Sequence, residues 1–130
     1  MLMLALDTNA YRALDDNNDA VITEVEKAQV LGLPITVLGE LYYGIERGSR
    51  KEQNLTNLRR FLDTPRLQVL EITKDTARVF GEIATELAGA GKPIQQNDIW
   101  IAALCKQYGF VLATADKGFT SITGLDTFSF

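Results

Sequence analysis

The sequence predicts a single α/β domain, spanning residues 1–130, in which helices cover both faces of a central, mostly parallel sheet of four to five strands. Two observations predict this class. Short apolar runs typical of buried strands recur along the chain, and segments with helical periodicity separate them. Strands separated by one or two whole helices cannot form hairpins, so parallel pairing is expected.

Each element follows from its local pattern of apolar residues, turn residues and helix caps. In the first half we expect a strand at 3–6, a helical turn at 10–14, a helix from 19 that Gly32 ends, a strand at 33–37 with Pro34 at its start, helices at 38–46 and 51–62, and a strand at 67–70. In the second half we expect a helix to about residue 88 that Thr73 caps, a helix from 97 or 98 to 108, a strand at 110–113 and a last strand at 125–130.

The composition excludes several classes of function. No apolar run approaches the ~20 residues of a membrane span, and Asp7 interrupts the N-terminus too early for a signal peptide, so we expect a cytoplasmic protein without a membrane partner. The chain has no histidine, which excludes Ser-His-Asp and Cys-His nucleophiles and histidine-ligated zinc. Its one cysteine, Cys105, lies in an apolar helical run and is predicted to be a core residue.

Four acidic residues are expected at the carboxyl ends of the strands. Asp7 and Asp116 each follow an apolar strand, Glu40 lies in the first turn of the helix after the second strand, and Asp98 opens a very apolar helix. Taken singly, each has an ordinary explanation as a helix cap or dipole partner. Taken together, four converging carboxylates would repel one another unless a cation offset them. Mg²⁺, or Mn²⁺ as a substitute, is the expected cation because both prefer oxygen ligands.

The charge of the chain is −4, but the positive charges are unevenly placed. Six basic residues lie between Arg47 and Arg66, against only two acidic ones. This segment fits a solvated helix face and a phosphate-facing patch equally well.

The acids lie in four motifs that together resemble a known family. The motifs are Asp7-Thr8-Asn9, Gly39 to Gly44 around Glu40, Pro93 to Ala103 around Asp98, and Thr114 to Phe119 around Asp116. Their ordered set resembles the acidic motifs of PIN-domain ribonucleases, and most closely those of the VapC-type toxins of bacterial and archaeal toxin-antitoxin pairs. The resemblance covers essentially the whole chain. One departure is Gln95, where family members often carry glycine.

This resemblance implies a Mg²⁺-dependent endoribonuclease toxin that forms a homodimer and is inhibited by a cognate antitoxin placed across its active-site cleft. Asp7, Asp98 and Asp116 are the expected ligands of one or two ions, and Glu40 is a further ligand or orients the attacking water. Attack by water on RNA would leave a 5′-phosphate and a 3′-hydroxyl.

Several polar residues near the acids have two readings. Thr8, Asn9 and Thr114 are expected either to orient the carboxylates or contact the scissile phosphate, or to cap helices and turns, and both kinds of role can hold at the same time. Arg12 either contacts phosphate or pairs with Asp15 or Asp16, and Asn97 is expected to be a helix cap.

The same residues bear on other functions and on a dimer interface. A receiver domain needs its phosphoacceptor after the third strand, where only Glu71 stands, and a haloacid-dehalogenase-type phosphatase needs an Asp where this chain has Asn9. A catalytically silent RNA- or protein-binding module is the remaining alternative. A dimer interface could use Tyr42 and Tyr43 with Leu55, Leu58, Phe61 and Leu62, although a core position is the expected fate of at least half of these.

Overall fold

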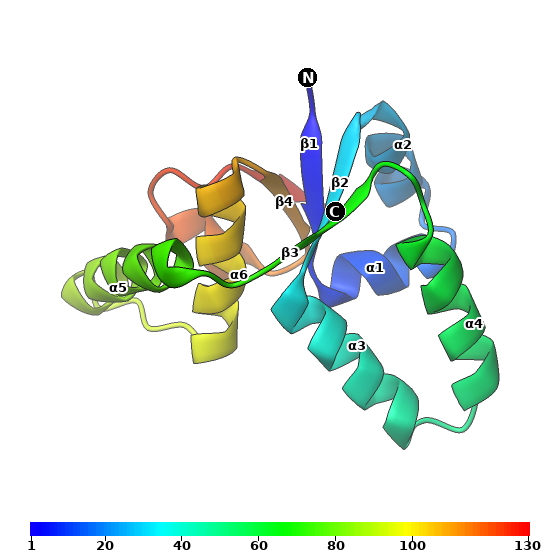
Figure 1. Ribbon diagram of the computed structural model, residues 1–130. Coiled ribbons are helices and arrows are strands. Elements are labelled where there is room, and N and C mark those ends of the chain that lie inside the picture. The colour runs from blue at the N-terminus through cyan, green and yellow to red at the C-terminus, as the bar shows by residue number, and fades with distance from the viewer.

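The computed structural model describes all 130 residues and contains one sheet of five strands. The strands are β1 (Met3–Leu6), β2 (Val30–Pro34), β3 (Leu67–Leu70), β4 (Val111–Thr114) and β5 (Thr127–Ser129). Their order across the sheet is β3-β2-β1-β4-β5, and every neighbouring pair is parallel (Figure 1). The predicted fold class is therefore confirmed.

Six α-helices and one short 3₁₀ helix connect the strands. They are α1 (Thr8–Asp15), α2 (Asp19–Lys27), α3 (Ile35–Arg47), α4 (Lys51–Leu62), α5 (Lys74–Gly89), α6 (Gln96–Tyr108) and η1 (Lys117–Ser121). No helix combines the length and the apolar character that crossing a bilayer requires.

Helices lie on both faces of the sheet because side chains alternate along each strand. In β1, Ala5 belongs to the larger core, which α5 and α6 cover, while Leu4 and Leu6 belong to a smaller core beneath α1 and α2. Figure 1 shows these two helix pairs on opposite sides of β1. Cys105 is fully buried in the larger core, as predicted.

The strand order reverses between β1 and β4. From β1 the chain adds β2 and β3 on one side, then crosses back to add β4 and β5 on the other. In an open parallel sheet, the two loops that leave the carboxyl ends of the strands at such a reversal diverge and leave a crevice between them. The fold therefore opens a crevice beside the ends of β1 and β4.

The predicted bounds of the second strand are wrong by three residues. Gly32 does not end a helix; it lies inside β2 opposite Ala5, and Pro34 ends the strand instead of starting it. A Cβ atom at Gly32 would lie 2.8 Å from Cε2 of Phe110, so close packing, not a turn, requires glycine here. Because α3 consequently begins at Ile35, Glu40 lies in the second turn of that helix and not in the first.

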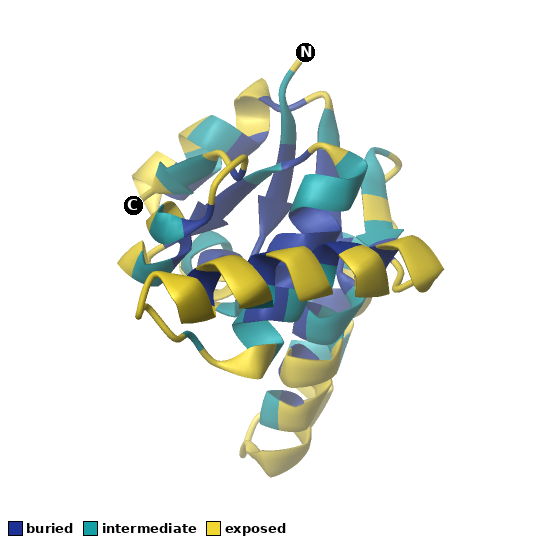
Figure 2. Cartoon of the chain, turned by 90° about the vertical axis from the view of Figure 1, so that its left-hand side faces the viewer, coloured by how far each residue is buried: buried dark blue, intermediate teal, exposed yellow.

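Helices α3 and α4 form an arm that projects from the body of the molecule (Figures 1 and 2). The apolar stripe of α4 faces inward: Leu58 is buried, and Leu55, Phe61 and Leu62 pack against the larger core. The ring of Phe61 also meets Tyr11 of α1 edge-on, with 5.1 Å between ring centroids. Leu58 is thus a core residue, the other three are partly buried against the core, and Tyr42 and Tyr43 remain exposed.

The buried stripe of α5 consists of Thr76, Val79, Ile83 and Leu87. Thr76 tolerates burial because its hydroxyl bonds the side chain of Gln107 on α6 and the backbone N–H of Thr73.

Candidate functional site

The four predicted acids come together in one cavity of about 320 Å³ at the carboxyl edge of the sheet. Asp7 follows β1 and caps α1, and Asp116 follows β4 and caps η1. Glu40 comes from α3, and Asp98 comes from the first turn of α6. The cavity thus lies at the reversal of strand order, and residues that are distant in sequence line it.

Asp7 is the most buried of the four, with 6% of its surface exposed. One carboxylate oxygen accepts a 2.8 Å hydrogen bond from the backbone N–H of Ala10, which is the usual contact of a helix cap. Burial raises the pKa of Asp7, and the charge of Asp116 adds to the rise, while hydrogen bonds from the Thr114 side chain and from backbone N–H groups oppose it. The cap contact and a cavity position therefore hold at the same time.

Asp98 is half-buried, because the helix that it opens is apolar and packs into the core. Burial raises its pKa, and the charges of Asp116, Glu40 and Asp7 raise it further, in that order. All three other acids thus act electrostatically on Asp98. This mutual repulsion is the property that a bound cation would relieve.

The residues beside the acids divide into two groups. Thr8 and Asn9 line the cavity, and the Oγ1 atom of Thr8 is buried without a hydrogen-bond partner. Thr114 does not line the cavity; it is buried beneath it, where its hydroxyl oxygen accepts a 3.0 Å hydrogen bond from the backbone N–H of Asp116. Thr114 therefore orients the Asp116 loop, while Thr8 and Asn9 can contact a ligand directly.

Asn97 has a role that the sequence did not indicate. It is the second residue of α6 rather than its cap, and its side-chain amide donates a 2.7 Å hydrogen bond to Oε1 of Glu40. This bond fixes an otherwise exposed carboxylate and leaves Oε2 of Glu40 free. Gln95 is the residue that caps α6, with a φ of −64° that any residue adopts, so the loop needs no glycine there.

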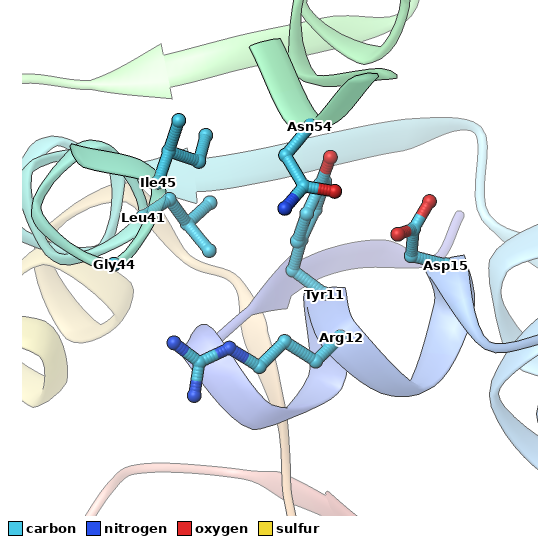
Figure 3. A pocket seen from close by; sticks show the side chains of 7 residues that line it. All are labelled: Tyr11, Arg12, Asp15, Leu41, Gly44, Ile45 and Asn54. Carbon is cyan, nitrogen blue, oxygen red and sulfur yellow. The ribbon is translucent and has the colours of Figure 1, made fainter. Parts of the chain in front are cut away.

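Arg12 crosses from α1 to α3 at the edge of the cavity. It lines the acidic cavity and also a smaller adjoining one, shown in Figure 3 with the Arg12 side chain extending toward Gly44 of α3. A Cβ atom at Gly44 would lie 3.1 Å from Nη2 of Arg12, which explains a glycine in mid-helix. The predicted alternative, an ion pair with Asp15 or Asp16, is not formed.

The basic segment does not form one patch. Arg47 lines the cavity, Lys51 pairs with Glu46, and Arg66 donates hydrogen bonds to the backbone carbonyls of Val25 and Ala28 at the end of α2. Lys51 and Arg66 thus make contacts within the fold, and Arg47 is the one basic residue of the six that lines the cavity.

The donor set fits a hydrated divalent ion. No three of the carboxylates are arranged to enclose an ion in their present rotamers. Mg²⁺ does not require such a cage, since it commonly keeps several waters and binds one or two carboxylates directly. The unpartnered Thr8 hydroxyl and the repulsion acting on Asp98 are both features that a hydrated cation would satisfy.

Comparison with known proteins agrees with this architecture. The sequence pattern of the PIN domain matches residues 4–125, so the chain belongs to the PIN-domain family. Ribonuclease VapC2 of Rickettsia felis is 32% identical over 106 residues, which are 78% of each chain. The tRNA(fMet)-specific endonuclease VapC of Shigella flexneri is 30% identical over 131 residues, covering 98% of this chain and 97% of its own.

Solved structures give the same result. The crystal structure of VapBC2 from Rickettsia felis bound to a promoter DNA fragment superposes with a TM-score of 0.87 at 29% identity and covers 99% of both chains. Within the PIN-domain family the chain therefore groups with the VapC ribonucleases, as the resemblance of its motifs implied. The receiver and phosphatase alternatives are thereby set aside.

Proposed function

We propose that this chain is a Mg²⁺-dependent endoribonuclease, with Mn²⁺ as a substitute ion, and that it is the toxin of a toxin-antitoxin pair. The observation that supports this most strongly is the gathering of Asp7, Glu40, Asp98 and Asp116 from four separate segments into one cavity. The VapC relatives carry the names of ribonucleases and of a tRNA endonuclease, which supports RNA as the substrate and hence a cytoplasmic site of action.

The roles of the chain's own residues follow from their contacts. When bound, Mg²⁺ would supply the positive charge that lowers the pKa of the attacking water and offsets charge on the phosphate. Asp7, Asp98 and Asp116 offer the oxygen ligands for that ion. Glu40, held through Oε1 by Asn97, has Oε2 available to accept a hydrogen bond from the water and orient it. Attack of the water on phosphorus breaks the bond to the 3′ oxygen and leaves a 5′-phosphate and a 3′-hydroxyl.

Two partners belong to the same proposal. A cognate antitoxin is proposed because the matching structures include VapBC complexes, one of them described as a member of a family of toxin-antitoxin systems. A homodimer is proposed from the resemblance to VapC toxins alone. Light scattering at micromolar concentration tests it, and a monomer there would contradict it.

The nuclease proposal is tested by incubating the purified protein with total RNA and sequencing the new 5′ ends. We expect cleavage that EDTA abolishes, that Mg²⁺ or Mn²⁺ restores, and that leaves 5′-phosphates. Asp98→Asn should lose it, because the substitution removes a ligand charge while keeping the shape of the side chain. Asp126→Asn is the matched control, since Asp126 is exposed and does not line the cavity.

Three results would contradict the proposal. They are cleavage that persists in EDTA, equal activity of Asp98→Asn and the wild type, and RNA binding without any cleavage in Mg²⁺ or Mn²⁺. The last result would favour the silent binding module instead.

A further inference from the structure

The acidic cavity has a second kind of wall that the four carboxylates do not account for. On α3, Glu40, Tyr43, Gly44 and Arg47 recur at intervals of three and four residues and all line this cavity. Glu40 therefore shares one face of α3 with the ring of Tyr43, one turn further on, and with the guanidinium of Arg47, two turns further on. Arg12 approaches the same wall from α1.

The positive groups of this wall are not neutralised by the acids beside them. The ion pairs of the structure join Lys27 to Glu24, Lys51 to Glu46, and Arg78 to both Asp75 and Glu82. Neither Arg12 nor Arg47 is paired, although four carboxylates line the same cavity. Two guanidinium groups without an ion pair on one side of a cavity suit a ligand that brings its own negative charge.

The Tyr43 ring is positioned by Arg47 rather than by the core. The Arg47 Cζ atom lies 5.1 Å from the ring centroid, and Nη1 donates a 3.2 Å hydrogen bond to the Tyr43 hydroxyl. Even so, 64% of Tyr43 is exposed, which is more than its neighbour Tyr42, at 41%. An exposed aromatic ring that is held in place at the mouth of a charged cavity is a surface on which a planar ligand can stack.

We propose that Tyr43 and Arg47 form a stacking platform for an unpaired nucleobase of the RNA next to the scissile phosphate, with Arg12 contacting a neighbouring phosphate. This inference rests on the proposed nuclease function and adds the part of the site that grips the substrate. Aromatic and guanidinium planes are the groups on which single-stranded bases stack, and a base within a duplex has no free face to offer. The platform therefore selects RNA in which the base beside the cut is unpaired.

The test measures binding apart from cleavage. A fluorescein-labelled single-stranded RNA that carries the mapped cut site is titrated with protein in EDTA, where no cleavage occurs, and anisotropy is read. We expect Tyr43→Leu to weaken binding about ten-fold, because it removes the stacking surface, and Tyr43→Phe to weaken it less, because it keeps the ring and loses only the hydrogen bond from Arg47. Tyr42→Leu is the matched control, since Tyr42 is the adjacent exposed tyrosine and does not line the cavity.

A second RNA locates the base. When the nucleotide beside the cut is replaced by an abasic one, wild-type binding should weaken, and Tyr43→Leu should cause little further loss. In Mg²⁺, Tyr43→Leu should raise KM more than it lowers kcat on the intact RNA. Two results would overturn the platform. One is equal RNA binding by Tyr43→Leu and the wild type. The other is a loss of binding free energy for Tyr43→Leu on the abasic RNA that equals the sum of the two separate losses.

The two proposals fail separately. A wild-type protein that cuts no RNA contradicts the nuclease. A wild type and a Tyr43→Leu variant that cut the same RNA with the same KM contradict only the platform. Unchanged thermal unfolding of Tyr43→Leu ensures that a loss of binding reflects the site and not the fold.

Discussion

Gly32→Ala tests the central packing of the sheet. The new Cβ atom would lie 2.8 and 2.9 Å from two ring atoms of Phe110 and 3.3 Å from Cδ1 of Leu70. Phe110 is 4% exposed and Gly32 is paired on both sides within the sheet, so neither can move away freely. Overpacking of this kind costs about 1–3 kcal/mol. Loss of glycine's backbone freedom in the unfolded chain returns roughly 0.5–1 kcal/mol. We therefore expect a net loss of about 1 kcal/mol, and at most about 2.5 kcal/mol.

Urea unfolding monitored by circular dichroism measures this loss. Gly81→Ala is the matched control, because Gly81 lies within α5 with nothing within 4 Å of a new Cβ atom, and should gain up to about 1 kcal/mol. Phe110→Leu in the Gly32→Ala background should recover part of the cost, with a coupling of about 1 kcal/mol. A Gly32→Ala protein that is as much stabilised as Gly81→Ala would refute the packing of Phe110 over β2.

The remaining predictions concern charge. Asp7→Asn should make the metal-free protein more stable at neutral pH, because it removes a buried repelling charge and keeps an oxygen that accepts the hydrogen bond from the backbone N–H of Ala10. Mg²⁺ at 100 times its Kd should stabilise the wild type by about 2.7 kcal/mol and should not stabilise the variant. Asp7 and Asp98 both have raised pKa values in the folded protein. Just above the ordinary pKa of 3.8, the folded metal-free protein therefore binds more protons than the unfolded chain. The contribution of these two groups to folding stability consequently falls as the pH rises through their raised pKa values. The stability gap between Asp7→Asn and the wild type should therefore widen between about pH 4 and pH 7 in urea titrations, and a constant gap would contradict the shifts. Arg66→Met should cost about 2 kcal/mol in the same assay, because it leaves the carbonyl of Ala28 without a donor and the carbonyl of Val25 with only the backbone N–H of Ala28, while the exposed Arg60→Met should change little.

Features with strong local signals were predictable from the sequence. The apolar run before Asp7 and the one before Asp116 each end at an acid, and parallel pairing brings such ends to one edge of the sheet. The cavity lies at that edge. Gly44 is a further local signal, because a glycine in mid-helix points to close packing, and Arg12 occupies the space that it leaves.

Features that depend on contacts between distant segments were not predictable. Gly32 followed a helical pattern and looked like a helix end, and only the packing of Phe110 from the far part of the chain reveals why glycine is needed inside a strand. Asn97 looked like a cap because its partner, Glu40, is 57 residues away. Arg66 lies in the basic segment 47–66, whereas the carbonyls that it bonds lie about 40 residues earlier in the chain.

The proposed function requires at least one divalent ion to be held among acids brought together from across the chain. Mn²⁺ binding followed by electron paramagnetic resonance measures this directly, without RNA or antitoxin. We predict that the wild type and Asp126→Asn bind Mn²⁺ alike, and that Asp7→Asn and Asp98→Asn each bind it much more weakly. Equal Mn²⁺ binding by all four proteins, or none by the wild type, would contradict the account.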